Sequence, residues 1–170
     1  MSYKSIDFVK KQDGIETAMN TWTAWHLIPS SRPVIVQPSI NYKYIDIPGK
    51  SGQLDLTDYL AGKPTYTDRK GSWEFYVVHD HFAYRPIGNS NYNERWQTSW
   101  QALRIALASF FDGSRMSVHL EDMSNAEWYK GRVFFNSWKS DKDFSKVVIE
   151  YQLDPYYYNG PGDTAKEVGL

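Results

Sequence analysis

Only one stretch of this 170-residue chain has the hydrophobic period of an α-helix, and this limits the folds it can adopt. Between Asn91 and Asp112, apolar residues recur every three or four positions and form one stripe. The stripe consists of Trp96, Trp100, Leu103, Leu107 and Phe110. Asn91 followed by Glu94 resembles a capping box, and Gly113 suits a left-handed helix end. The pattern predicts one helix at about residues 92–112.

The rest of the chain consists of short segments rich in β-branched and aromatic residues, separated by turn residues. The segments predicted to be strands are 6–9, 22–28, 34–37, 39–47, 73–84, 116–122, 128–138 and 144–153. The clearest alternation is at 73–84, with Trp73, Phe75 and Val77 on one face. These segments predict a mainly β (α+β) fold of about seven to nine short strands with one helix, a β-sandwich or a barrel-like sheet capped by that helix.

One loop has a composition that favours a projecting turn. Pro48 is followed by Gly49 and Gly52 within 45–57, and glycines at this spacing suit positive φ angles. We therefore expect a projecting hairpin or loop near 45–57. The length corresponds to a single domain, expected at 1–158. Residues 159–170 are expected to be a flexible tail, because Pro155 and Pro161 interrupt any strand and the last residues are small or charged.

Composition and charge exclude several classes of protein. The chain has no cysteine, so it can form no disulfide, thiol nucleophile or cysteine-ligated metal site. Nineteen basic residues balance twenty acidic ones, so the strong positive field of nucleic-acid-binding proteins is absent overall. No stretch is apolar and long enough for a membrane-spanning helix, and the start of the chain lacks the apolar core of a secretory signal. We expect neither nucleic-acid specificity nor membrane association.

The one candidate metal site is the pair His79 and His81, because alternate residues on a strand share a face. Cupin-like metal centres use such a pair, but they need a carboxylate a few residues later, and none occurs before Glu94. His26 and His119 could complete a shell, although their spacing does not require it. The alternative is that these histidines are half-buried structural residues.

No other motif indicates catalysis or a bound cofactor. The serines lack the Gly-x-Ser-x-Gly context of a nucleophile elbow, and Gly49 and Gly52 are not followed by a helix that could cradle phosphate. The residues therefore indicate no active site, and we expect no cofactor.

The aromatic content of 28 residues, 16% of the chain, allows more than one function. Tyr156, Tyr157 and Tyr158 are consecutive and cannot all point inward, so they are candidates for a subunit or partner contact. The alternative is a segment that lies on the surface and holds the tail in place. Exposed tryptophan or tyrosine could also stack on sugar rings, which keeps a carbohydrate-binding β-sandwich module as the second candidate function.

Several short motifs occur in an order that resembles a known family. They are IDIPGKSGQLDLT at 45–57, Tyr66-Thr67-Asp68-Arg69 leading into WEFYVV, the helix WQTSWQALRIALASFFDG, and WYKGRVFF followed by a β-rich run that ends in DPYYY. Together they span about residues 20–158. In this order the segment is similar to the N-terminal domain of siphophage distal tail proteins.

The resemblance implies a structural protein of the virion tail, not an enzyme, that assembles in the host cytoplasm. Its fold would be a β-sandwich with a helix and a projecting hairpin. Copies would form a ring, expected to be a hexamer, that connects the tail tube protein to the tail tip or baseplate hub protein. Pro48, Gly49, Gly52 and Leu54 of the hairpin would lie at ring contacts or at the lumen. Longer members continue into a second, galectin-like or oligosaccharide-binding-like domain, so carrying receptor-binding proteins is not part of the expectation.

Overall fold

The structure is a computed structural model that describes residues 4–59, 61–78, 92–140 and 144–170, with the backbone alone at 78, 92–100, 140 and 144. The helices are α1 (Thr21–Trp25) and α2 (Tyr92–Phe110). The strands are β1 (Ile6–Gln12), β2 (Ile15–Asn20), β3 (Leu27–Pro29), β4 (Tyr44–Asp46), β5 (Gln53–Asp55), β6 (Arg69–Val78), β7 (Asp112–Leu120), β8 (Trp128–Ser140), β9 (Phe144–Tyr158) and β10 (Glu167–Gly169).

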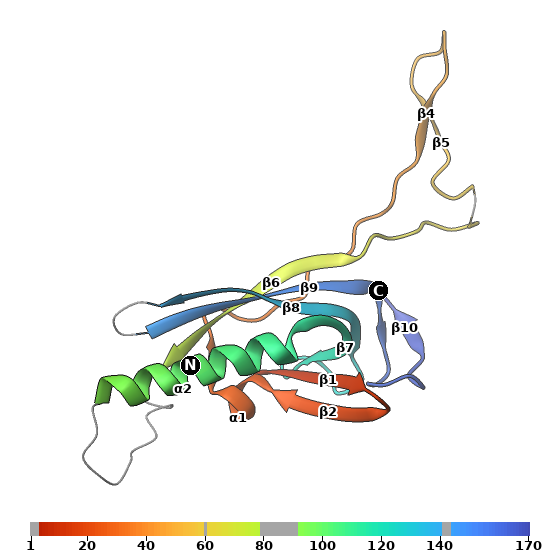
Figure 1. Ribbon diagram of the computed structural model, residues 1–170. Coiled ribbons are helices and arrows are strands. Elements are labelled where there is room, and N and C mark those ends of the chain that lie inside the picture. The colour runs from red at the N-terminus through yellow and green to blue at the C-terminus, as the bar shows by residue number, and fades with distance from the viewer. Residues whose placement is uncertain (1–3, 60, 79–91, 141–143) are drawn as a thin grey trace.

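Most of the strands belong to one curled sheet with the order β2-β1-β7-β8-β9-β6-β3, and β10 pairs with β9. All the pairings are antiparallel. In Figure 1, β6, β8 and β9 lie above β1 and β2, so the sheet curls into two layers. β4 and β5 form a separate pair that projects from these layers. The predicted mainly β fold is confirmed, with its layers joined into one continuous sheet.

The short helix α1 links the two outer strands of the curled sheet. It follows β2 at one end of the strand order and precedes β3 at the other. Asn20 caps it, because its side-chain oxygen accepts hydrogen bonds from the backbone N–H groups of Trp22 (2.9 Å) and Thr23 (3.1 Å). His26 ends it in the left-handed conformation, at φ 50°. The segment 22–28 was predicted to be a strand, and this was wrong for its first half: a polar cap outweighed the β propensity of the tryptophans.

The core fills the space inside the curled sheet. Trp73, Phe75 and Val77 of β6 are buried, which confirms the predicted inward face of that strand. Residues 79–84 of the predicted strand lie outside the described part of the chain. Leu103 and Leu107 of α2 are also buried in this core, as the helical stripe predicts. The side chains of Trp96 and Trp100 are outside the described part.

The helix α2 ends at Phe110, two residues before the predicted end. Phe111 then enters the core with 1% of its surface exposed and packs edge-to-face on Phe8 at 4.9 Å between ring centroids. Gly113 has a φ of 88°, so the expected left-handed glycine is present. It lies at the start of β7, because the chain turns directly from the helix into that strand.

The segment 34–37 is not a strand, contrary to the prediction. Its backbone polar groups bind side chains instead of another strand. Trp73 Nε1 donates to the Val34 carbonyl at 2.9 Å, and the Val36 N–H donates to the Tyr151 hydroxyl at 3.1 Å. Of the predicted strand 39–47, Tyr44–Asp46 forms β4 and Ile40 makes an isolated bridge to Tyr66.

The strand β9 continues through Pro155 to Tyr158, where a break was predicted. The register with β8 shifts here, from Gly131 opposite Leu153 to Tyr129 opposite Tyr157. This bulge accommodates a proline, which has no N–H to donate to the ladder.

The predicted flexible tail, 159–170, contains the paired strand β10. The Asn159 N–H donates to the Lys166 carbonyl at 3.1 Å, and the Lys166 N–H donates to Asn159 Oδ1 at 2.8 Å. These bonds close the loop between β9 and β10. The sequence predicts no strand there, because glycine and charged residues disfavour one. Whether 1–158 folds as one domain without this segment stays a prediction.

Candidate assembly interface

A two-stranded arm, residues 38–59 and 61–68, projects away from the curled sheet (Figure 1). Near its root, the Asn41 N–H donates to the Thr65 carbonyl and the Thr67 N–H donates to the Ser39 carbonyl, both at 2.8 Å. Further out, β4 pairs with β5, with Ile45 opposite Leu54. The predicted projecting hairpin is therefore present, and it is longer than the 45–57 loop.

The tip of the arm is a turn built from the residues that the sequence singled out. The Lys50 N–H donates to the Ile47 carbonyl at 3.2 Å, so Pro48 and Gly49 are the two central residues of the turn. Gly49 has a φ of 78° and Gly52 has a φ of 90°. Proline followed by a glycine with positive φ is the signature of a type II turn. The predicted positive φ angles are confirmed.

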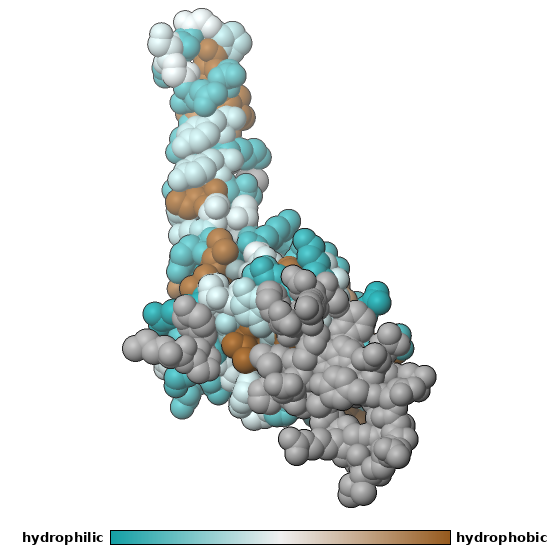
Figure 2. Space-filling model, turned by 90° about the vertical axis from the view of Figure 1, so that its left-hand side faces the viewer, coloured by the Kyte–Doolittle hydropathy of each residue, from teal (hydrophilic) through white to brown (hydrophobic). Residues whose placement is uncertain are grey.

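Apolar side chains lie on both faces of the arm. Ile45 and Leu54, a cross-strand pair, are each 46% exposed on one face. On the other face, Tyr42 and Tyr44 stack with ring centroids 5.9 Å apart, and remain 60% and 48% exposed. Tyr59, at 79%, is the most exposed of the arm's aromatic residues. Figure 2 shows brown apolar residues at several heights along the projecting column. A two-stranded ribbon of this kind is marginally stable alone in water.

Some polar groups of the arm bind one another. Gln53 donates from Nε2 to Asp46 Oδ1 at 2.8 Å. Thr57 donates to Asp55 from its hydroxyl at 2.5 Å and from its N–H at 2.9 Å, and these bonds hold the pKa of the Asp55 carboxyl below its usual value. The exposed surface of the arm is therefore mixed, with apolar side chains between polar ones.

The root of the arm is fixed by a buried arginine, Arg69. It is 1% exposed, the most deeply buried charged side chain among the described residues. Its Nε donates to the Pro155 carbonyl at 2.9 Å, and its Nη1 donates to the Val36 carbonyl at 3.0 Å and to Gln37 Oε1 at 3.3 Å. One guanidinium thus joins the outgoing leg, the returning leg and the β9 bulge. Burial lowers the pKa of Arg69 from its usual value, although guanidinium stays charged in proteins.

An aromatic ring supports this guanidinium. The Tyr129 ring centroid lies 5.0 Å from Arg69 Cζ, which suits a cation–π contact. The Tyr129 hydroxyl donates to Glu127 Oε1 at 2.9 Å. Burial, together with that carboxylate, raises the pKa of Tyr129 to about 12. Because Tyr129 contacts both residues, the negative charge of the Glu127 carboxylate lies near the Arg69 guanidinium.

Two further aromatic residues hold the outgoing leg. Trp73 and Tyr151 stack with ring centroids 4.2 Å apart and bind the backbone of 34–36. Gly71 leaves the room for this pair, because a Cβ there would lie 2.4 Å from the Tyr151 hydroxyl oxygen. The root is thus made by inward-facing side chains of β6 and β9.

The three consecutive tyrosines are half-buried. Tyr156 packs edge-to-face on Tyr66 at the arm root, at 6.2 Å between ring centroids. Tyr157 packs against the core, and the Tyr158 hydroxyl donates to Asp154 Oδ2 at 3.0 Å. Burial and Asp154 raise the pKa of Tyr158 to about 12. These contacts suit the surface-lying alternative, while a role of the tyrosines at a subunit contact stays a prediction.

The metal hypothesis gains no support from the described residues. His79 and His81 lie outside the described part of the chain. His119 is buried, where its Nδ1 is 3.0 Å from the Glu127 carbonyl oxygen and its ring stacks on Trp128. His26 caps α1. In residues 4–59, 61–78, 92–140 and 144–170 no three His, Asp or Glu side chains are grouped as metal ligands would be. Within the same ranges, no helix is both long and apolar enough to span a bilayer.

Arg69 is part of the motif Tyr66-Thr67-Asp68-Arg69, but its structural role was not predicted, although its position in the strand pattern indicated one. Arg69 shares the alternating inward face of Trp73, Phe75 and Val77. A charged residue at an inward position of a strand must find partners or cost several kcal/mol, on the order of 3 or more. Which partners it would find could not be read from the sequence, because they are backbone carbonyls of distant segments.

Comparison with known proteins gives one informative result. No protein-family model matches the chain, and no curated protein matches it in sequence. Among solved structures, the chain matches the crystal structure of SPP1 Dit (gp 19.1), described as a paradigm of the hub adsorption apparatus in phages that infect Gram-positive bacteria. The fold is similar to that of SPP1 Dit.

The match has a TM-score of 0.51 at 16% sequence identity, and it covers 91% of this chain. It covers 52% of the SPP1 Dit chain, so this protein spans about half the length of its structural relative. At this identity the likeness shows the fold. It agrees with the fold expected from the distal tail resemblance.

Proposed function

We propose that this protein is a structural component of a phage tail, whose copies form a ring that joins the tail tube to the tail tip or baseplate. The observation that carries the proposal is the arm, which exposes apolar side chains on both faces away from the body of its own subunit. The likeness of the fold to a phage hub protein supports the same role. We propose no catalytic activity and no cofactor.

We take the ring, rather than an open filament, from the distal tail resemblance. An arm that binds a different surface on the next copy makes a head-to-tail contact, and such contacts give a closed ring when the rotation closes. We take six copies from the distal tail resemblance. The partners above and below the ring would be the tail tube protein and the tail tip or baseplate hub protein. The site of action would be the virion tail, after assembly in the host cytoplasm.

The rigid root explains how an exposed arm could serve assembly. Arg69 and the Trp73–Tyr151 pair fix the direction of both legs before any partner binds. A preorganised arm loses less conformational entropy on docking than a flexible one does. We propose that Leu54 and Ile45 enter the subunit contact, while Pro48, Gly49 and Gly52 shape the tip.

The test is the mass of the particle in solution. Leu54→Asp places a charge at the apolar contact, so we expect it to shift the protein from a ring to a monomer in native mass spectrometry and light scattering. Ile15→Asp is the matched control, because Ile15 is a 70% exposed aliphatic residue at the β1–β2 turn on the body. We expect the control to assemble normally. A wild-type protein that stays monomeric, alone and with tail tube protein, would contradict the proposal.

A further inference from the structure

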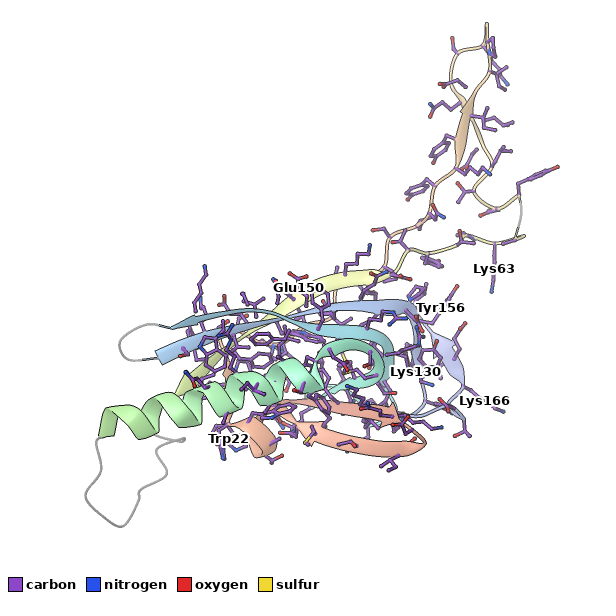
Figure 3. All side chains as sticks on the ribbon, viewed as in Figure 1. Trp22, Lys63, Lys130, Glu150, Tyr156 and Lys166 are labelled. Carbon is purple, nitrogen blue, oxygen red and sulfur yellow. The ribbon has the colours of Figure 1, made fainter. Side chains whose placement is uncertain are left out.

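A second surface, far from the arm, has the features of a ligand site, and its centre is Trp22. Among the described tryptophan side chains, Trp22 is the exposed one, at 43%, whereas Trp25 and Trp73 are buried. Figure 3 shows Trp22 on α1, at the opposite end of the molecule from the arm. Its ring meets the His26 ring edge-on, with centroids 5.3 Å apart.

Beside Trp22 lies a pocket of about 340 Å³, at the lower end of the size range of small-ligand sites. It lies between the start of β1, the helix α1 and the strand β3. Leu27, Ile28 and Pro29 supply apolar surface. The polar part of the lining comes from Lys4, Ser5, Asn20, Thr23 and Glu121.

Some of these polar groups are already used within the fold. Asn20 accepts two backbone hydrogen bonds through Oδ1, and its Nδ2 donates to Ser5 Oγ (2.8 Å) and to Asp7 Oδ1 (2.6 Å). Glu121 accepts from the Ser5 N–H through Oε2 at 3.0 Å. These bonds fix the wall of the pocket, and they leave Asn20 no capacity for a ligand.

Other polar groups remain available. Within the described part of the chain, the Lys4 ammonium, the Thr23 hydroxyl and Oε1 of Glu121 make no hydrogen bond. The pocket therefore combines an aromatic plate, an apolar wall, one cationic donor, one anionic acceptor and one hydroxyl. The two charges cancel, so the site does not favour an anionic or a cationic ligand.

We propose that this pocket binds a neutral saccharide. The C–H face of a pyranose ring would stack on the Trp22 indole, since sugars present such an apolar face to aromatic side chains. Its hydroxyl groups would donate to the Glu121 carboxylate and accept from Lys4 and Thr23. An apolar peptide side chain would use the wall but would leave these polar groups unmatched and desolvated, which is unfavourable.

The experiment titrates the full chain with neutral mono- and disaccharides of glucose, galactose and N-acetylglucosamine. The readout is the indole N–H signals in ¹H–¹⁵N NMR spectra. We expect one of these sugars to shift the Trp22 signal, with a Kd of about 1 mM. Trp22→Ala should weaken binding at least about tenfold, as truncation of a central aromatic contact does. Glu121→Gln should weaken it less, because the amide oxygen can still accept from Ser5.

The matched control is Tyr59→Ala, which removes an exposed aromatic side chain from the arm. We expect this variant to bind the sugar as the wild type does. Trp22→Phe, which keeps a smaller aromatic plate, should retain part of the affinity and guards against a folding effect of the alanine variant. No binding by any sugar of the panel would overturn the proposal, and so would binding that Trp22→Ala leaves unchanged. Neither result bears on the ring, which is tested by particle mass.

Discussion

Replacing Arg69 tests whether one buried guanidinium holds the arm root together. In Arg69→Met, the carbonyl groups of Val36 and Pro155 lose their donor while the side chain keeps most of its volume. Both bonds are only part-buried and Val36 is 48% exposed, so water replaces part of the lost donor. Each acceptor then costs about 1–2 kcal/mol, the lower part of the range for a buried unpaired group, which gives about 2–4 kcal/mol for the pair.

Part of this loss is offset, because the native state no longer buries a charge whose Nη2 has no hydrogen-bond partner. We therefore expect Arg69→Met to lower the free energy of unfolding by about 1–3 kcal/mol. For a chain of this length, the melting temperature should fall by roughly 6 °C.

Arg69→Lys separates geometry from charge. A lysine ammonium is a compact charge and cannot span the carbonyls of Val36 and Pro155 as a planar fork does. We expect it to be nearly as destabilising as methionine. Arg132→Met is the control, because Arg132 is an exposed arginine that donates to the Gly113 carbonyl at 3.1 Å. It should change stability by no more than about 0.5 kcal/mol.

The assay is urea denaturation followed by circular dichroism, with hydrogen exchange to locate the change. The Asn41 and Thr67 N–H groups, which pair the two legs, should exchange faster in Arg69→Met. If Arg69→Met is as stable as the wild type, or if Arg69→Lys restores full stability, the reasoning about the root is refuted.

Two other predictions concern the body. Gly131→Ala should destabilise the protein by about 3 kcal/mol in thermal unfolding, because the new Cβ would lie 2.2 Å from the Gln152 carbonyl oxygen. Gly160→Ala is the control and should be nearly neutral, because its Cβ would have no atom within 4 Å. Equal stabilities of the two variants would contradict the close approach of β8 and β9. Hydrogen bonds from Ser114 and Lys10 hold the pKa of Asp112 well below its usual 3.8, so its contribution to stability is present above that value and is lost as the pH falls below it. Asp112→Asn should therefore flatten the acid limb of a stability–pH curve measured by denaturation, and an unchanged limb would argue against the Lys10–Asp112 pair.

The parts of the fold that follow from local pattern could be predicted from the sequence. The alternation in β6 placed Trp73, Phe75 and Val77 in the core, and the helical stripe placed Leu103 and Leu107 there. The arm tip followed from proline and glycine, since backbone conformation at a turn depends on a few adjacent residues. These features need no knowledge of distant contacts.

The parts that failed depend on contacts between distant segments. The segment 34–37 has strand composition, but its partners are side chains of β6 and β9 that no local pattern reveals. Proline at 155 predicts the end of a strand, whereas a register shift opposite Tyr129 and Gly131 accommodates it. The helix α1 is short and depends on the Asn20 cap, so its tryptophans were assigned to a strand.

The projecting arm was predicted in part. The tip residues and Leu54 were singled out, and the structure places them on a projecting arm. The role of Arg69 was missed because its partners are backbone carbonyls of distant segments. The stacked Tyr42–Tyr44 pair was missed because its exposure depends on the length of the arm. Trp22 was counted among strand residues, and its pocket forms only when β1, α1 and β3 come together.

The measurement that tests the central claim most directly is electron microscopy of the purified full chain, alone and mixed with tail tube protein. The account predicts closed rings with a central hole and six-fold symmetry, in which each arm lies on the neighbouring copy. Leu54→Asp should abolish the rings, while Ile15→Asp should leave them intact. Small single particles under both conditions, or rings that form equally well with Leu54→Asp, would contradict the account.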